Sequence, residues 1–229
     1  MNIARITTWV VAFLCTAAAF AQPAATRTED PKTDRWERDI RRFEAQDQKQ
    51  PPPQDGILFL GSSTMVLWDL KKSFPGLPVI NRGFGGSQYA DSARYADRIA
   101  IPYRPKVAVL YAGDNDIARG KSPAQVLADF EQLRTKLQKA LPEVKIVVLG
   151  IKPSVARWSL VEKMREANRL IRESVAGDKR IVFIDTDRPM LAPDGKPRAD
   201  LLRKDGLHLN DAGYRLWSSL VRPHLNLAK

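Results

Sequence analysis

Cysteine and histidine are almost missing from this chain of 229 residues, which contains one cysteine and two histidines. Zinc and other transition-metal sites take many of their ligands from these two residue types. Two acidic segments, residues 113–116 and 185–187, could suggest a metal-dependent phosphoesterase. The shortage of further ligands argues against that class, and we expect no metal site.

Long apolar runs are also missing from the N-terminal region. The run from Trp9 to Phe20 has about a dozen residues, whereas a membrane-spanning helix needs roughly 20. Arg5 precedes the run and Ala19-Phe20-Ala21 follows it, a pattern typical of a secretory signal peptide over residues 1–21. Cleavage there removes Cys15, so the mature chain forms no disulfide. We expect a secreted protein without a stable membrane anchor, and the periplasm fits the pattern best.

Basic residues, in contrast, are plentiful. Lysine and arginine outnumber aspartate and glutamate by 37 to 26, which gives a formal net charge of +11. The basic residues are scattered: no run of five occurs, no aromatic residues interleave with a basic stripe, and no zinc-finger or RNA-recognition signature is present. We therefore expect a solvated basic surface and no nucleic-acid partner.

The remaining sequence is organised as a polar leader over residues 22–34 and a single domain over residues 35–229. An amphipathic helix is predicted to begin near Thr33 or Asp34 and to end before Pro51. After it, short apolar runs alternate with segments of helical period. The apolar runs lie at residues 57–60, 78–80, 107–111, 144–149 and 181–184, and the clearest helical periods lie at residues 123–141, 160–175 and 212–221. This alternation predicts a parallel five-stranded sheet between two helical layers, an α/β/α sandwich.

Ligands bind to such sheets beyond the carboxyl ends of the strands. If the strand order is 2-1-3-4-5, Gly86 and Asn115 follow the two strands on either side of the one that precedes Ser63. A serine hydroxyl between hydrogen-bond donors suits acyl transfer, because the attacking oxygen creates an oxyanion that donors must stabilise. The backbone N–H groups of Ser63 and Gly86 and the side-chain amide of Asn115 are the candidate donors.

A serine nucleophile needs a base that titrates near neutral pH, which is a property of histidine. The two candidates are His208 and His224. His224 has no carboxylate nearby in the sequence, whereas Asp205 stands three residues before His208. Asp205 can therefore hold the imidazole of His208 in the required tautomer. Residues 186–204 form a segment long enough to carry this pair from the last strand to Ser63.

These residues fall into four ordered blocks, which resemble the SGNH (GDSL) hydrolases. The blocks are Gly61-Ser62-Ser63-Thr64, Asn81-Arg82-Gly83-Phe84-Gly85-Gly86, Gly113-Asp114-Asn115-Asp116 and Asp205-Gly206-Leu207-His208. The second block is most similar to that of the platelet-activating-factor acetylhydrolase-like branch. The resemblance implies a flavodoxin-like fold and ester hydrolysis without a metal or other cofactor. It also implies Ser63 as nucleophile, His208 as base and Asp205 as its orienting partner, with Ser63, Gly86 and Asn115 forming the oxyanion hole.

The first two blocks depart from the family pattern. Ser62 replaces the usual aspartate of the first block, and Ser87 stands where an aspartate often follows the second. Neither departure removes a group that does chemistry, but the first leaves a choice between two adjacent serines. Ser63 is preferred because the family's nucleophile is the third residue of its block.

The substrate is the least defined part of the prediction. Arg157 and Trp158 follow the fourth predicted strand, so they are candidates for binding an anionic group and for stacking on a sugar or covering an acyl chain. Equally, both side chains could pack against the domain. No long apolar lid segment is visible, which favours a short acyl group such as acetate on a small-molecule or glycan ester. The alternatives are a lysophospholipase or lipase, and a non-catalytic carbohydrate-binding envelope protein on the same scaffold.

The sequence motifs of two other enzyme classes are missing, and the motif of a dinucleotide-binding fold is incomplete. The sequence contains no G-x-S-x-G of an α/β-hydrolase and no S-x-x-K of a penicillin-binding enzyme. The glycines Gly83 and Gly85 are followed by Gln88 where a dinucleotide-binding motif requires a third glycine.

Overall fold

The fold is built on a parallel sheet of five short strands. The computed structural model describes residues 35–226, so the predicted signal peptide and leader lie outside the described residues. The sheet has the order β2-β1-β3-β4-β5, as predicted, and every neighbouring pair is parallel. Its strands are β1 (Ile57–Gly61), β2 (Val79–Gly83), β3 (Val107–Tyr111), β4 (Lys145–Leu149) and β5 (Ile181–Ile184). Both faces of the central strands β1 and β3 are buried, which explains why these strands are continuously apolar.

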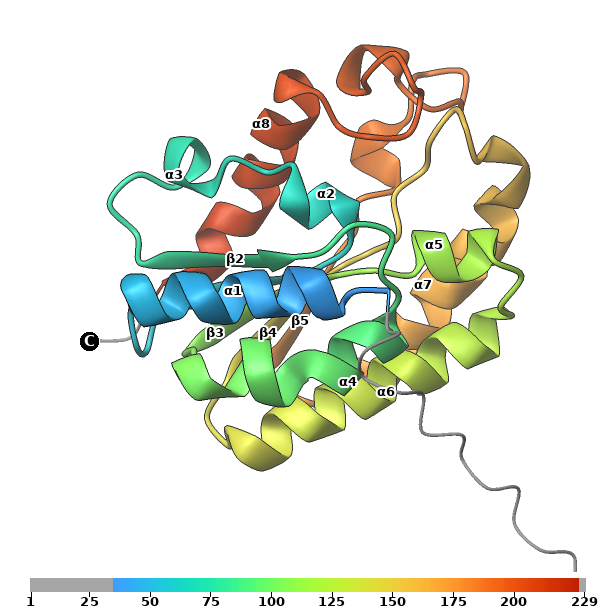
Figure 1. The fold of residues 1–229 in the computed structure, drawn as a ribbon. Coiled ribbons are helices and arrows are strands. Elements are labelled where there is room, and N and C mark those ends of the chain that lie inside the picture. Colours follow the sequence, from blue (N-terminus) through green and yellow to red (C-terminus); the bar gives the residue numbers. More distant parts are fainter. Residues whose placement is uncertain (1–34, 227–229) are drawn as a thin grey trace, which may run out of the picture. The chain divides into compact units, whose positions relative to one another are not determined.

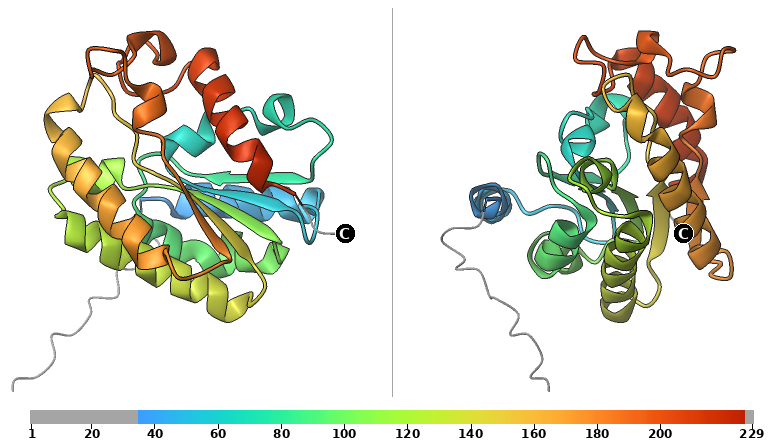
Figure 2. Two further views of the ribbon diagram at one scale, coloured as in Figure 1. Left: turned by 180° about the vertical axis from the view of Figure 1, so that it is seen from behind. Right: turned by 90° about the vertical axis from the view of Figure 1, so that its right-hand side faces the viewer.

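Helices cover both faces of the sheet, so the architecture is the predicted three-layer sandwich (Figures 1 and 2). Apolar side chains of α1 (Glu37–Lys49), α4 (Tyr89–Ile99), α6 (Pro123–Ala140) and α7 (Val161–Val175) share one hydrophobic core with the sheet. Side chains of α2 (Ser63–Val66), α3 (Leu70–Ser73) and α8 (Asp211–Val221) share the core on the opposite face. A further short helix, α5 (Asp114–Ala118), follows β3. No helix within residues 35–226 is long and apolar enough to cross a membrane.

Helix α1 is amphipathic and packs on the domain through Ile40 and Phe43. Its predicted cap at Thr33 or Asp34 falls outside the described residues, and the observed helix follows Trp36 as its N-cap. The Trp36 indole donates a hydrogen bond to the carbonyl oxygen of Gly85 at 3.0 Å. The beginning of α1 therefore lies beside the loop that follows β2 (Figure 1).

The segment between β5 and α8 carries the chain back across the carboxyl edge of the sheet. It forms two 3-10 turns, Arg188–Met190 and Ala199–Leu201, and an isolated antiparallel bridge joins Leu202 to Leu209. Met190, Leu201, Leu202 and Leu209 are buried in the core beneath α8. The segment is therefore an ordered part of the domain, more structured than its irregular sequence pattern indicates.

Candidate active site

Ser63 and His208 meet at the carboxyl edge of the sheet, although they are 145 positions apart in the sequence. Ser63 is the first residue of α2, two residues beyond the end of β1. Its Oγ lies 3.0 Å from Nε2 of His208, which is hydrogen-bonding distance. The neighbouring hydroxyl of Ser62 is fully buried and has no hydrogen-bond partner within the described residues. The geometry thus places Ser63, and not Ser62, next to the base.

Asp205 orients the imidazole from the other side. Its Oδ2 lies 2.6 Å from Nδ1 of His208, and its Oδ1 accepts the backbone N–H groups of Leu207 and His208 at 2.9 and 3.0 Å. The His208 hydrogen bond and then the two backbone N–H groups hold the pKa of the Asp205 carboxyl well below its usual range. Asp205 therefore stays ionised, and its charge favours the imidazole tautomer that leaves Nε2 free to accept the serine proton.

A buried lysine supports the loop that carries His208. Lys152 is 1% exposed and lies three residues beyond the end of β4. Its Nζ donates a hydrogen bond of 2.7 Å to the carbonyl oxygen of Leu207, and burial lowers the pKa of the ammonium group. Sequence reasoning missed Lys152, and its only signal was its place directly after a strand. We infer that this contact fixes the backbone immediately before His208.

Candidate oxyanion donors come from three neighbouring strand ends. Gly61 at the end of β1 pairs in register with Gly83 of β2 and Tyr111 of β3, so the segments that follow these strands leave the sheet side by side. Gly86 adopts a φ of 73°, a conformation that favours glycine. Within residues 35–226, no protein oxygen accepts the backbone N–H of Ser63 or of Gly86. Both N–H groups are free to donate to a ligand.

The side chain of Asn115 is held by two hydrogen bonds. Its Nδ2 donates to the carbonyl oxygen of Ser87 at 3.1 Å, and its Oδ1 accepts a hydrogen bond of 3.0 Å from Arg157. The Ser87 hydroxyl in turn donates to the carbonyl oxygen of Gly61 at 3.2 Å. The loops after β2 and β3 are therefore tied to each other and to the end of β1, where Ser63 begins α2.

Arg157 and Trp158, the two residues predicted to bind substrate, both contact other side chains of the domain. The guanidinium of Arg157 bonds to Asn115 and forms an ion pair of 3.0 Å with Asp114, and its side chain is 19% exposed. Trp158 is half-buried, and the guanidinium of Arg165 lies 5.6 Å from the centre of its ring. The guanidinium of Arg157 thus contacts residues of the candidate oxyanion hole, and little of it is exposed to bind an anionic ligand.

His224 lies away from this site. It follows α8 in a 3-10 turn, and burial together with the charge of Lys145 at the beginning of β4 lowers the pKa of its imidazole. Within residues 35–226, His224 makes no hydrogen bond or ion pair with Ser63, Asp205 or His208.

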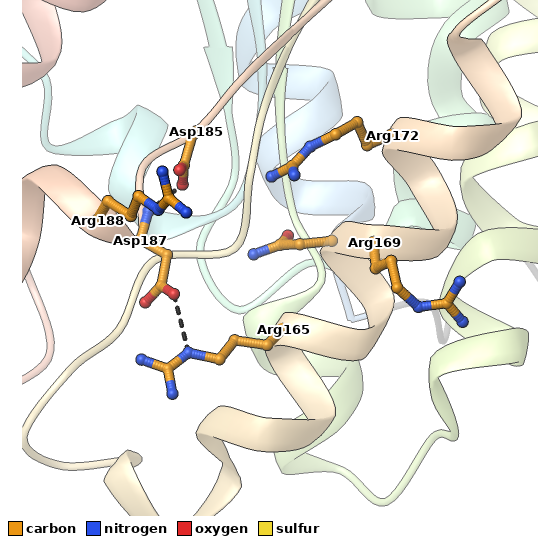
Figure 3. Close-up of a pocket in the computed structure, with 7 residues that line it drawn as sticks. Arg165, Arg169, Arg172, Asp185, Asp187 and Arg188 are labelled. Atoms are coloured by element: carbon orange, nitrogen blue, oxygen red, sulfur yellow. Dashed lines mark hydrogen bonds and ion pairs between the residues drawn. The ribbon is translucent and has the colours of Figure 1, made fainter. Parts of the chain in front are cut away.

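An arginine-lined cavity of about 400 Å³ lies at the end of β5 and along α7 (Figure 3). None of the predicted site residues lines it. Arg165 and Arg169 at this cavity already pair with carboxylates of neighbouring residues. Within the described residues, no group of three or more histidine, cysteine, aspartate or glutamate side chains is arranged to hold a metal ion.

Comparison with known proteins gives consistent matches. A family model described as the GDSL-like Lipase/Acylhydrolase family matches residues 63–216. Platelet-activating factor acetylhydrolase IB subunit alpha1 from Homo sapiens is 30% identical over 199 residues, which cover 82% of each chain. The solved structure of a GDSL-like lipase from Bacteroides thetaiotaomicron VPI-5482 has a TM-score of 0.71 and 18% identity, covering 81% of this chain and 96% of that one. A carbohydrate esterase family 3 structure from Talaromyces cellulolyticus has a TM-score of 0.57 and 21% identity, covering 74% and 95%.

Proposed function

The chain belongs to the GDSL-like lipase/acylhydrolase family and is a carboxylic ester hydrolase, and we propose that it cleaves short-chain esters, above all acetyl esters, with Ser63 as nucleophile. The observation that carries this proposal is the relay of short contacts from Ser63 through His208 to Asp205, at 3.0 and 2.6 Å. The imidazole of His208 is thus within hydrogen-bonding distance of both the proposed nucleophile and the orienting carboxylate.

In the proposed reaction, His208 accepts the proton of the Ser63 hydroxyl as Oγ attacks the ester carbonyl carbon. The negative charge that develops on the carbonyl oxygen is met by the N–H groups of Ser63 and Gly86 and by Nδ2 of Asn115. The intermediate collapses when the carbon–oxygen bond to the leaving alcohol breaks and His208 returns the proton to that alcohol. Water then attacks the acyl-serine by the same route, releases the carboxylic acid and regenerates Ser63.

The preference for a short acyl group rests on the surface around the site. Within residues 35–226, the exposed large hydrophobic side chains are Val66, which is 44% exposed, and Val155, which is 52% exposed. Val66 ends α2, and Val155 packs against Gly206 in the Asp205–His208 loop. Two exposed valines offer too little apolar surface to bury a long acyl chain, which favours a short acyl group. The name of one relative, an acetylhydrolase, supports the same direction.

A series of p-nitrophenyl esters from acetate to laurate tests the chain-length preference. We expect kcat/KM to be highest for acetate and to fall with chain length, and we expect Ser63→Ala to remove activity on every ester. Activity confined to the long esters would contradict the preference and favour a lipase. Hydrolysis of an acetylated glycan alongside a lysophospholipid then separates the two substrate classes. A folded protein that binds glycan but cleaves no ester would support a non-catalytic carbohydrate-binding protein.

We also propose that the signal peptide is cleaved after Ala21 and that the mature protein is exported to the periplasm. The charged start, the apolar run and the Ala19-Phe20-Ala21 segment support this proposal. N-terminal sequencing of the protein from fractionated cells is expected to find a chain that begins at Gln22 in the periplasmic fraction. An uncleaved chain in the cytosol would contradict it.

A further inference from the structure

The amide of Asn115 can be useful to an oxyanion in only one of its two orientations. An asparagine amide has an oxygen on one side, which accepts hydrogen bonds, and a nitrogen on the other, which donates two. In the structure, Nδ2 gives one hydrogen to the carbonyl oxygen of Ser87 and keeps the second. A rotation by half a turn would direct the oxygen to this place and offer an incoming oxyanion an acceptor in place of a donor.

The groups around Asn115 stabilise the useful orientation. Oδ1 accepts a hydrogen bond of 3.0 Å from Nη2 of Arg157, while Nδ2 donates to the carbonyl oxygen of Ser87 at 3.1 Å. After a half turn, Nδ2 would face the donors of the guanidinium and Oδ1 would face the carbonyl oxygen. Both hydrogen bonds would be lost, and groups of like polarity would lie against each other.

Arg157 is itself held in place by Asp114. Its Nη1 forms an ion pair of 3.0 Å with Oδ2 of Asp114, a side chain that is 6% exposed, and this contact is not aligned as a hydrogen bond. The other oxygen of the same carboxylate accepts the backbone N–H of Asn115 at 2.9 Å. One buried aspartate therefore fixes both the guanidinium and the backbone of the residue that the guanidinium contacts. The planar, forked guanidinium can contact Asp114 and Asn115 together, which the single ammonium of lysine does less well.

We propose that Arg157 is a positioning residue for the oxyanion hole, which holds the Asn115 amide with Nδ2 toward the developing negative charge. The inference rests on the proposed function and assigns to Arg157 a role different from binding an anionic part of the substrate. Because Asn115 acts on the charge that forms during the reaction, loss of Arg157 lowers kcat and leaves KM nearly unchanged.

The test is a double-mutant cycle on p-nitrophenyl acetate with Arg157→Ala, Asn115→Ala and the double variant. Loss of one oxyanion donor typically lowers kcat on the order of 10²-fold to 10³-fold. We expect Arg157→Ala to approach the loss seen for Asn115→Ala, and the double variant to be no slower than Asn115→Ala alone. If the kcat losses of the two single variants multiply in the double variant, the proposal is overturned. It is also overturned if Arg157→Ala raises KM at constant kcat.

Rescue of kcat by free guanidinium distinguishes a positioning role of Arg157 from a purely structural one. Millimolar guanidinium chloride is expected to restore part of the kcat of Arg157→Ala and none of that of Asn115→Ala. Absence of rescue in a folded Arg157→Ala variant would count against the proposal. Because removal of Arg157 leaves Asp114 without its buried partner, Arg157→Lys serves as the second variant. It keeps the charge and is expected to retain an intermediate kcat, whereas a wild-type kcat would contradict the need for a forked donor.

Arg172→Ala is a matched control on the face of α7 that borders the cavity beside β5 (Figure 3). Arg172 is exposed, and its guanidinium packs 4.9 Å from the ring centre of Phe183, without contact to the site. Its kcat is expected to equal that of the unaltered protein. Ester hydrolysis that survives Ser63→Ala would refute the proposed function, whereas independent effects at Arg157 and Asn115 would refute only the positioning role.

Discussion

Arginine side chains lie at two places on the carboxyl edge of the same sheet, and the guanidinium group makes different contacts at each. Beyond β3, Arg157 is 19% exposed and bridges the neutral Asn115 amide and an Asp114 carboxylate that is 6% exposed. Along α7, Arg169 is 52% exposed and pairs with two glutamates that are 45% and 59% exposed. Exposed ion pairs contribute little, because water and salt screen them. A buried guanidinium that fixes a neutral amide instead determines where a hydrogen-bond donor points.

The same comparison shows that a sizeable cavity need not be the active site. The cavity beside β5 measures about 400 Å³ and is lined by arginines, aspartates and one asparagine (Figure 3). It contains neither a serine nor a histidine, and its asparagine, Asn168, is bonded to the backbone of Ile151. The Ser63 edge, by contrast, places a nucleophile, a base and free N–H groups together. Substitutions at the two places should therefore differ sharply in their effect on catalysis.

The largest effect should follow from Asp205→Asn at the Ser63 edge. An amide at this position favours the wrong imidazole tautomer and removes the charge that stabilises the imidazolium. We expect kcat for p-nitrophenyl acetate at pH 7 to fall on the order of 10³-fold to 10⁴-fold. A fall of less than tenfold in a folded variant would show that His208 does not depend on this carboxylate.

Lys152→Met should lower kcat less than Asp205→Asn does, and it should not lower the free energy of unfolding. Without the Lys152 bond to Leu207, the backbone before His208 is less well fixed, and kcat should fall on the order of tenfold to 100-fold. Burial disfavours the Lys152 ammonium, so an apolar side chain of similar length should leave the unfolding free energy equal or higher at pH 7. Urea unfolding and steady-state kinetics measure the two effects. A destabilised variant with unchanged kcat would assign Lys152 to the fold alone.

The pH dependence of stability should distinguish Asp205 from an ordinary surface carboxylate. Its pKa is lowered in the folded state from an ordinary value of 3.8, so its stabilising effect is present above that value. The effect is lost as the pH falls through the depressed folded pKa. We expect the difference in unfolding free energy between wild type and Asp205→Asn to shrink as the pH falls below about 4. A difference that grows between about pH 4 and about pH 2 would contradict the assigned direction.

The smallest effect should come from the arginine-lined cavity beside β5. Arg169→Ala removes exposed pairs with Glu166 and Glu173, which contribute little to stability because water and salt screen them. The kcat for p-nitrophenyl acetate should be unchanged, and the urea midpoint should shift only slightly. A tenfold loss of kcat would show that the cavity beside β5 is coupled to the Ser63 edge.

The sequence predicted the sheet well because its central strands β1 and β3 are buried on both faces. The predicted strand at residues 107–111 coincides with β3, whereas the second strand continues from its apolar start through polar Asn81 to Gly83. That extension lies on the edge strand, where the apolar pattern is weak. The family match confirms the resemblance carried by the four blocks.

The contacts between side chains in the site were harder to predict than the four sequence blocks. Arg157 is a candidate for binding substrate because its segment leaves the carboxyl end of a strand beside the site. Its contact with Asn115 could not be predicted, because that contact depends on how the segment after β4 packs. Lys152 escaped notice for a similar reason, since lysine is rarely buried. The adjacent serines differ only in their position at the beginning of α2, which places Ser63 and not Ser62 against His208.

Labelling with an organophosphate tests the central claim most directly. Diethyl p-nitrophenyl phosphate transfers a diethylphosphoryl group to an activated serine, and peptide mass spectrometry locates the adduct. The prediction is a single adduct on Ser63, which forms much more slowly in His208→Ala. An adduct on Ser62, or loss of esterase activity with Ser63 unmodified, would contradict the assignment of Ser63 as the nucleophile.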